Sequence, residues 1–95
     1  MLIVRTFSAG VFAVRAIEDR SADGKRGTLR DARRLWYWDG AASLSELADK
    51  GTSKPRTCKF PVSVDSIEVT EIIEVLPVSN DAELSISSVP IWSAR

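Results

Sequence analysis

The densest group of residues that could bind a ligand lies between positions 33 and 38. Its members are two arginines and three aromatic residues: Arg33, Arg34, Trp36, Tyr37 and Trp38. A guanidinium can hold a phosphate through parallel hydrogen bonds, and an indole or phenol ring can stack on a flat base. We therefore predict a small nucleotide-like ligand, with Arg33 and Arg34 on the phosphate and one or more of the rings on the base.

The same residues also have a purely structural interpretation, which the sequence leaves open. Large aromatic side chains usually pack in cores, and arginine stems can cover a sheet rim while their charged ends stay in water. In that case Trp36 is a core anchor, and Trp36→Ala costs about 3–5 kcal/mol of stability. If Arg33 and Arg34 are ligand-binding residues, replacing either by Ala should weaken binding and leave folding nearly intact.

Two further segments, 54–60 and 5–12, combine positive charge with a ring or with a turn that offers backbone donors. Backbone amides near a turn can help to hold an anion. The candidate ligand-binding residues added from these segments are Arg5, Arg56 and Lys59. The alternative for segment 54–60 is a solvated loop with Phe60 packed in the core.

The sequence lacks the residues on which most hydrolase and metalloenzyme chemistry depends. It contains no histidine and one cysteine, Cys58, so these 95 residues form no disulfide, no Cys/His zinc site and no nucleophile–histidine pair. A lone cysteine without a base is more often a small buried apolar residue. No acidic pair has the spacing of a calcium loop or of paired catalytic acids. We expect a non-enzymatic protein with no metal and no cofactor.

Length and charge narrow the class of protein further. Ninety-five residues suit one domain, so we expect residues 1–95 to form a single unit. Thirteen basic and thirteen acidic side chains give a net charge of zero, which argues against binding of duplex nucleic acid. Arg5 interrupts the apolar start of the chain, and the apolar runs are short. We expect no signal peptide, no membrane span and a cytoplasmic location.

The first half of the chain predicts strands followed by a short helix. Residues 2–7 and 11–17 read as a β-hairpin, and a third strand is expected at about 28–38. Alternation along that strand would place Arg34 on the face of Trp36 and Trp38, and Arg33 on the face of Leu35 and Tyr37. A capping box at Ser43 and Glu46 predicts a helix from Leu44 to Lys50, with Gly51 as its C-terminal cap.

The second half predicts mainly strand. Residues 62–78 alternate as one long strand closed by Pro77, with a β-bulge at Ile72–Ile73 where the phase breaks. A brief helix is predicted after Ser79 or Asn80, and residues 89–93 form a last short strand. The fold class is therefore α+β, a mainly antiparallel sheet of about five strands with one or two short helices on one side. Such a sheet has edges to hide, which favours a homo-oligomer.

Several segments in succession carry a resemblance that spans nearly the whole chain. They are AGVF, DARRLWYWDGAASLSELA, GTSKP, CKFPV, VTEIIEVLPV and VPIW. In this succession the chain resembles small phage and prophage-encoded proteins that form domains of unknown function. It is also similar to the small phage proteins that counter bacterial Thoeris defence by sequestering a signal of the cyclic ADP-ribose type. The second resemblance implies an oligomeric, non-catalytic protein that binds nucleotides through arginines and aromatic residues.

Together these features predict a phage-encoded anti-defence protein of the host cytoplasm. It would bind and sequester a nucleotide-derived immune signal, of the cyclic ADP-ribose or cyclic oligonucleotide type. One alternative is a protein-binding inhibitor of a bacterial defence system, similar to an anti-CRISPR, that uses a β-edge or the acidic region 65–83. A second alternative is a minor virion or assembly component.

Overall fold

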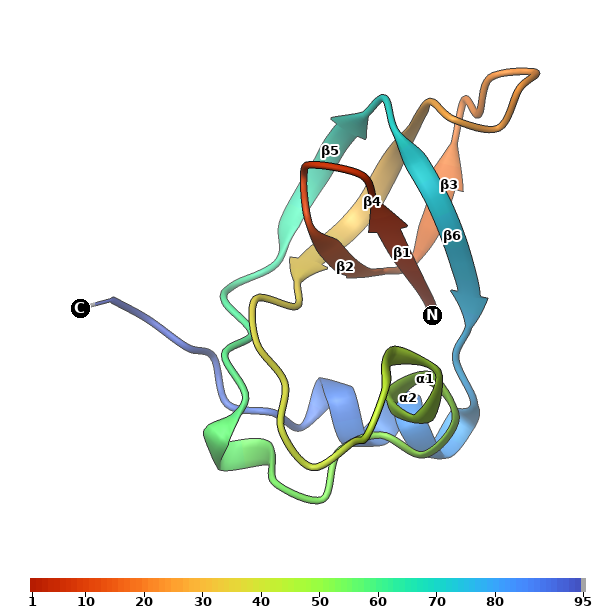
Figure 1. The fold of residues 1–95 in the computed structure, drawn as a ribbon. Helices are drawn as coiled ribbons and strands as arrows, with labels where there is room; N and C mark the ends of the chain where they lie inside the picture. The colour runs from red at the N-terminus through yellow and green to blue at the C-terminus, as the bar shows by residue number, and fades with distance from the viewer. Residues whose placement is uncertain (95) are drawn as a thin grey trace.

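Across residues 1–94, which the computed structural model describes, six strands curl into one antiparallel sheet and two helices lie together at one end of it (Figure 1). The elements are β1 (Leu2–Thr6), β2 (Val11–Val14), β3 (Ala16–Glu18), β4 (Gly27–Arg34), α1 (Leu44–Lys50), a 3₁₀ turn (Pro55–Thr57), β5 (Val64–Val69), β6 (Ile72–Pro77) and α2 (Asn80–Ser87). The predicted α+β class and antiparallel sheet are confirmed.

The central strand of the sheet is β4. Strands β2 and β3 pair with one edge of β4 and β5 pairs with its other edge, while β1 joins β2 to β6. The hairpin of β1 and β2 is confirmed, with Leu2 opposite Val14 and Gly10 at φ 101°, a conformation that glycine adopts at little cost. The predicted strand 11–17 is interrupted at Arg15, so that β2 and β3 lie one after the other along β4.

The predicted extension of the third strand to residue 38 was wrong. The predicted alternation of its side chains between the two faces of the sheet was also wrong. The strand ends at Arg34, and Asp31 has φ 51°, a left-handed conformation that Asp tolerates better than most residues. Leu29 and Ala32, three residues apart, therefore pack in the same buried cluster. The expected pairing of Arg34 with Trp38 also fails, because Trp38 packs against the cluster that holds Leu35.

The single long strand predicted over 62–78 is two strands. The chain turns between Val69 and Ile72, after which β6 pairs with β1 while β5 stays with β4. Figure 1 shows β5 and β6 diverging from this turn. Both Val69 and Ile72 pack inside the curled sheet. The predicted bulge at Ile72–Ile73 is confirmed, because the pairing steps from Arg5 opposite Glu74 to Thr6 opposite Ile72 and leaves Ile73 as the extra residue of β6. The predicted strand 89–93 is reduced to one bridge, between Ile91 and Phe60.

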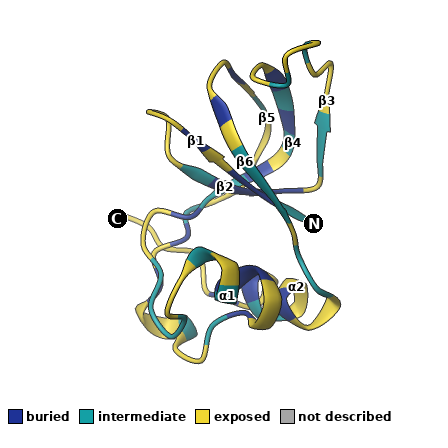
Figure 2. Ribbon diagram, turned by 45° about the vertical axis from the view of Figure 1, so that its right-hand side comes forward, coloured by how far each residue is buried: buried dark blue, intermediate teal, exposed yellow. Residues whose placement is uncertain are grey.

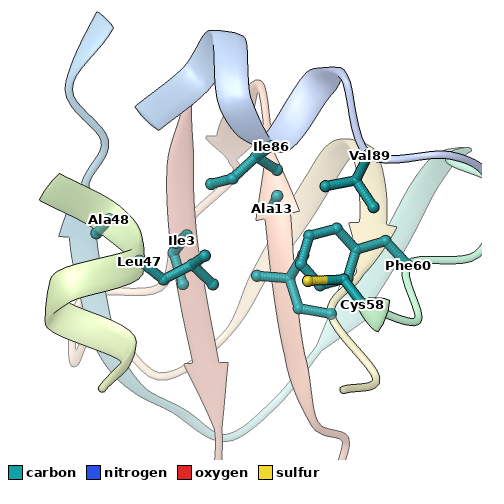
Figure 3. Close-up of a cluster of buried hydrophobic side chains, with 9 residues drawn as sticks. Ile3, Ala13, Leu47, Ala48, Cys58, Phe60, Ile86 and Val89 are labelled. Carbon is teal, nitrogen blue, oxygen red and sulfur yellow. The ribbon is translucent and has the colours of Figure 1, made fainter. Parts of the chain in front are cut away.

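Two clusters of buried side chains hold the fold together. The first lies inside the curled sheet and includes Val4, Phe12 and Leu29. The second lies between the sheet and the helices, where Leu47 and Ile86 meet residues of the sheet and of the 58–60 segment (Figure 3). Exposed residues follow the outward sides of both helices and the turns farthest from them (Figure 2). Three loop segments also lie together: the one after β4, the one around Lys59 and the one after α2. They form the candidate site.

Side-chain caps begin both helices. The predicted N-cap of α1 is confirmed, because the Ser43 hydroxyl accepts a hydrogen bond from the Glu46 amide at 3.1 Å. The return bond of the capping box differs, since the Glu46 carboxylate accepts from the Ala42 amide at 3.3 Å. At α2, the Ser79 hydroxyl accepts from the Ala82 amide at 3.0 Å and donates to the Asp49 carbonyl at the end of α1 at 2.5 Å. Ser79 therefore joins the two helices as well as starting the second one.

Replacing Ser79 by Ala should lower the free energy of unfolding by about 1–2 kcal/mol, because one hydroxyl serves two backbone groups that then lose their partner. The midpoint of chemical denaturation measures the loss. The matched control is Ser45→Ala, at an exposed position inside α1, where a change within about 0.5 kcal/mol is expected. Equal denaturation midpoints for the two variants would contradict the conclusion that the Ser79 hydroxyl stabilises the helices.

Candidate ligand-binding surface

An exposed lysine lies between two exposed aromatic rings. The Lys59 amine is 5.8 Å from the centre of the Tyr37 ring and 5.7 Å from that of the Trp92 ring. The exposed fractions are 48% for Tyr37 and 40% for Trp92, which are large for aromatic side chains. We call these three residues, Tyr37, Lys59 and Trp92, the Lys59 surface.

Backbone pairing fixes this arrangement. Tyr37 forms an antiparallel bridge with Lys59, whose amide donates to the Tyr37 carbonyl at 2.7 Å. On the other side, Ile91 forms a parallel bridge with Phe60, and the Trp92 amide donates to the Phe60 carbonyl at 3.0 Å. Phe60 itself is fully buried. The chain at 59–60 therefore runs between two other segments and is anchored by a core ring.

In the described part of the chain, the charge of Lys59 is not paired with a carboxylate. Among residues 1–94, none of the ion pairs involves Lys59. Each ring attracts the ammonium with about 0.5–1 kcal/mol at an exposed site. A positive charge flanked by exposed π-faces can attract an anion while the rings stack on a flat group, which are the two contacts a nucleotide needs.

Arg33 adjoins this surface, but its donors are used within the fold: one of its acceptors, the Phe60 carbonyl, also accepts from the Trp92 amide. Its guanidinium donates to five backbone carbonyls, those of Phe60, Pro61, Ile86, Val89 and Pro90, at 2.9–3.3 Å. It also stacks on the Phe60 ring at 5.5 Å. Burial lowers the pKa of the Arg33 guanidinium from its usual value. These contacts join β4 to the end of α2, so we no longer expect Arg33→Ala to leave folding intact.

Arg34 also contacts the fold. Its guanidinium covers the Phe12 ring at 4.5 Å and donates to the Ala9 carbonyl in the β1–β2 turn. The side chain is half-buried at the rim of the sheet. The structure therefore places the two neighbouring arginines in different surroundings: Arg33 holds the backbone beside the Lys59 surface, and Arg34 is bonded to the β1–β2 turn.

The remaining predicted residues are scattered. Arg5 pairs with Glu74 of β6 at 2.8 Å, and Arg56 is exposed in the 3₁₀ turn. Trp36 is next to Tyr37, and its amide donates to the Lys59 carbonyl at 3.2 Å. The core-anchor interpretation of Trp36 is wrong, because 65% of the residue is exposed. Trp38 fits that interpretation better, since it is half-buried against the cluster of Leu35.

Sequence reasoning missed Trp92. It contributes one of the two rings, yet it lies 33 positions after Lys59 in a tail that we expected to be only an edge strand. Trp92 is placed by the parallel bridge between Phe60 and Ile91. This bridge joins distant parts of the chain, so no local sequence pattern predicts it. The single usable signal was its sequence setting, an aromatic residue two positions after a proline near the end of the chain.

No helix in the described residues is long and apolar enough to cross a membrane.

Three comparisons with known proteins bear on the family of this chain. Neither the search of curated proteins nor the search of solved structures found a match. A family model does match, over residues 1–86, and it describes a domain of unknown function. The chain therefore belongs to the family of the domain of unknown function DUF6948.

Proposed function

We propose that this chain is a non-catalytic binding protein that holds a small nucleotide-like anion on the Lys59 surface. The observation that supports this is the position of the Lys59 amine between two exposed rings, with no carboxylate paired to it in the described chain. Lys59 would meet the phosphate, and Tyr37 or Trp92 would stack on the base. In this proposal Arg33 and Arg34 no longer contact the ligand directly, and they instead support the surrounding structure.

The finer proposal is that the ligand is an immune signal and that binding sequesters it. A phage-encoded anti-defence protein of the bacterial cytoplasm would need tight binding without turnover, and an exposed aromatic and cationic surface suits that role. The candidate signals are cyclic ADP-ribose isomers and cyclic oligonucleotides. We also propose a homo-oligomer, since β6 pairs with one neighbour only and leaves an edge that a second copy can cover.

Calorimetric titration tests the nucleotide proposal. The protein, at micromolar concentration, is titrated with cyclic ADP-ribose isomers and with cyclic di- and trinucleotides. We expect heat of binding with at least one of them and an unchanged ligand when it is recovered after denaturation of the protein. The absence of heat with every member of the panel would end the proposal, and a recovered ligand that had been cleaved would contradict a non-catalytic role.

One observation favours a second function, a protein-binding inhibitor. Trp36, Val62 and Ile91 are all more than 60% exposed and lie on the three segments that form the Lys59 surface or adjoin it. Large exposed apolar residues beside Trp and Tyr are typical of protein interfaces. Pull-down from a host lysate discriminates the two functions. A protein recovered in stoichiometric amount supports the inhibitor, whereas a sequestering protein recovers a nucleotide and no such partner.

A further inference from the structure

A hollow of about 330 Å³ lies on the other side of Arg33, between the sheet and α2. It is lined by the end of β2, by the bend of β4 and by residues of α2. A second, more open hollow of about 530 Å³ adjoins it, and both are lined by Arg15 and Asp31. The smaller hollow is at the lower end of the size range of small-molecule sites.

Arg15 and Asp31 carry opposite charges in this shared hollow, yet they do not pair. In the part of the chain that the structure describes, neither side chain takes part in an ion pair or a side-chain hydrogen bond. The other charges nearby are already used, because Glu83 pairs with the Met1 amine at 3.1 Å and Arg30 pairs with Glu18. Arg33 also lines the smaller hollow, but its guanidinium is bonded to backbone carbonyls. Among the described residues, the charged side chains of the two hollows that remain without an ion pair are therefore Arg15, Asp31 and Asp65.

The backbone holds these two residues in place. Asp31 is in the left-handed conformation at φ 51°, where the strand bends. Arg15 is anchored opposite, since its amide donates to the Arg30 carbonyl at 2.9 Å. A non-glycine residue in this conformation is uncommon and has an energetic cost. The bend at Asp31 therefore lies at the shared hollow, which Arg15 lines from the neighbouring segment.

The floor of the smaller hollow is apolar. Ala13 and Val14 come from β2, and Ile86 comes from α2. A ligand with an apolar body can rest here and keep its charged ends at the mouth. Ser63 and Ser87 also line the hollow, together with Arg33 and the paired Met1 and Glu83.

We propose that this hollow binds a small zwitterion, an α-amino acid with an apolar side chain. Its carboxylate pairs with Arg15, its ammonium group pairs with Asp31, and its side chain lies over Ala13, Val14 and Ile86. Arginine suits a carboxylate because its planar donors match the two oxygens. Asp65, which lines the open hollow, adds negative charge for the ammonium group. The site shares no residue with the Lys59 surface, so it is independent of the proposed function.

Amide NMR titration of the tag-free protein tests this proposal. The ligands are leucine, methionine and phenylalanine, each compared at millimolar concentration with derivatives that lack one charge, N-acetyl-leucine and leucinamide. The matched variants are Arg15→Gln and Asp31→Asn. Asn adopts the left-handed conformation as readily as Asp, so the second variant removes the charge and keeps the bend.

We expect a free amino acid to shift the amide signals of Ala13, Arg15, Asp31, Ser63 and Ser87. Each derivative and each variant should weaken binding by about tenfold or more, because one charge pair is lost in each case. Lys59→Ala should bind the amino acid like the wild type. Three results would overturn the proposal: no shift with any of the three amino acids, equal binding of N-acetyl-leucine or leucinamide, or unchanged binding in either variant.

Discussion

Arg33→Ala is expected to lower the free energy of unfolding by about 3 kcal/mol, since several charge-assisted hydrogen bonds are lost and the carbonyls they served lose a fixed partner. Those carbonyls lie at the end of α2 and at residues 60–61, so the loss should loosen the contact between sheet and helices. The readout is the midpoint of chemical denaturation at constant slope.

Two further variants make this result specific. Arg33→Lys should recover only part of the stability, because an ammonium cannot reproduce the fan of donors that a guanidinium offers. Arg56→Ala is the matched control, for Arg56 is exposed and none of the hydrogen bonds or ion pairs found in residues 1–94 involves its side chain. It should change stability by no more than about 0.5 kcal/mol. If Arg33→Ala and Arg56→Ala were equally stable, Arg33 would not join the sheet to α2.

The second large effect concerns binding. For a nucleotide that gives heat in the calorimeter, Lys59→Ala and Trp92→Ala should each weaken affinity by about tenfold to a hundredfold, since a stacked base contributes about 1–3 kcal/mol and a charged contact a similar amount. Stability should change little in Lys59→Ala, because the Lys59 side chain is exposed. Calorimetric titration of each variant gives the ratio of dissociation constants.

Lys54→Ala is the control for that result. Lys54 has the same charge and lies in the same loop, but none of the ring contacts in the described chain involves it. Its affinity should equal that of the wild type at matched ionic strength. A Lys59→Ala protein that binds as well as Lys54→Ala would show that the ligand is held elsewhere.

The local parts of the fold could be predicted from sequence, and the long-range parts could not. The β1–β2 hairpin and both helices follow from turn and capping residues a few positions apart, such as Ser43 and Glu46. The division of residues 62–78 into β5 and β6 depends on which strands they meet, β4 and β1, and that is decided by the whole sheet. The apolar phase break at Ile72–Ile73 correctly indicated a bulge, but it did not reveal the turn that separates Val69 from Ile72.

The candidate site shows the same limit. The sequence indicated Tyr37 and Lys59 as candidates but did not join them, since 22 positions separate them. The sequence could not show that the Arg33 guanidinium donates to backbone carbonyls, because every residue has a backbone carbonyl and none of them marks itself as an acceptor in the sequence. It also placed Arg34 with Trp38 by alternation, which the left-handed Asp31 and the end of β4 at Arg34 make invalid.

The most direct test of the Lys59 surface is an amide NMR map of the wild-type protein titrated with the cyclic nucleotide panel. The account predicts that at least one nucleotide shifts the signals of Tyr37, Lys59 and Trp92 together, including the indole N–H of Trp92, and that the signals of β3 stay in place. The account is contradicted if no nucleotide moves these signals, or if the shifts gather on a different part of the chain.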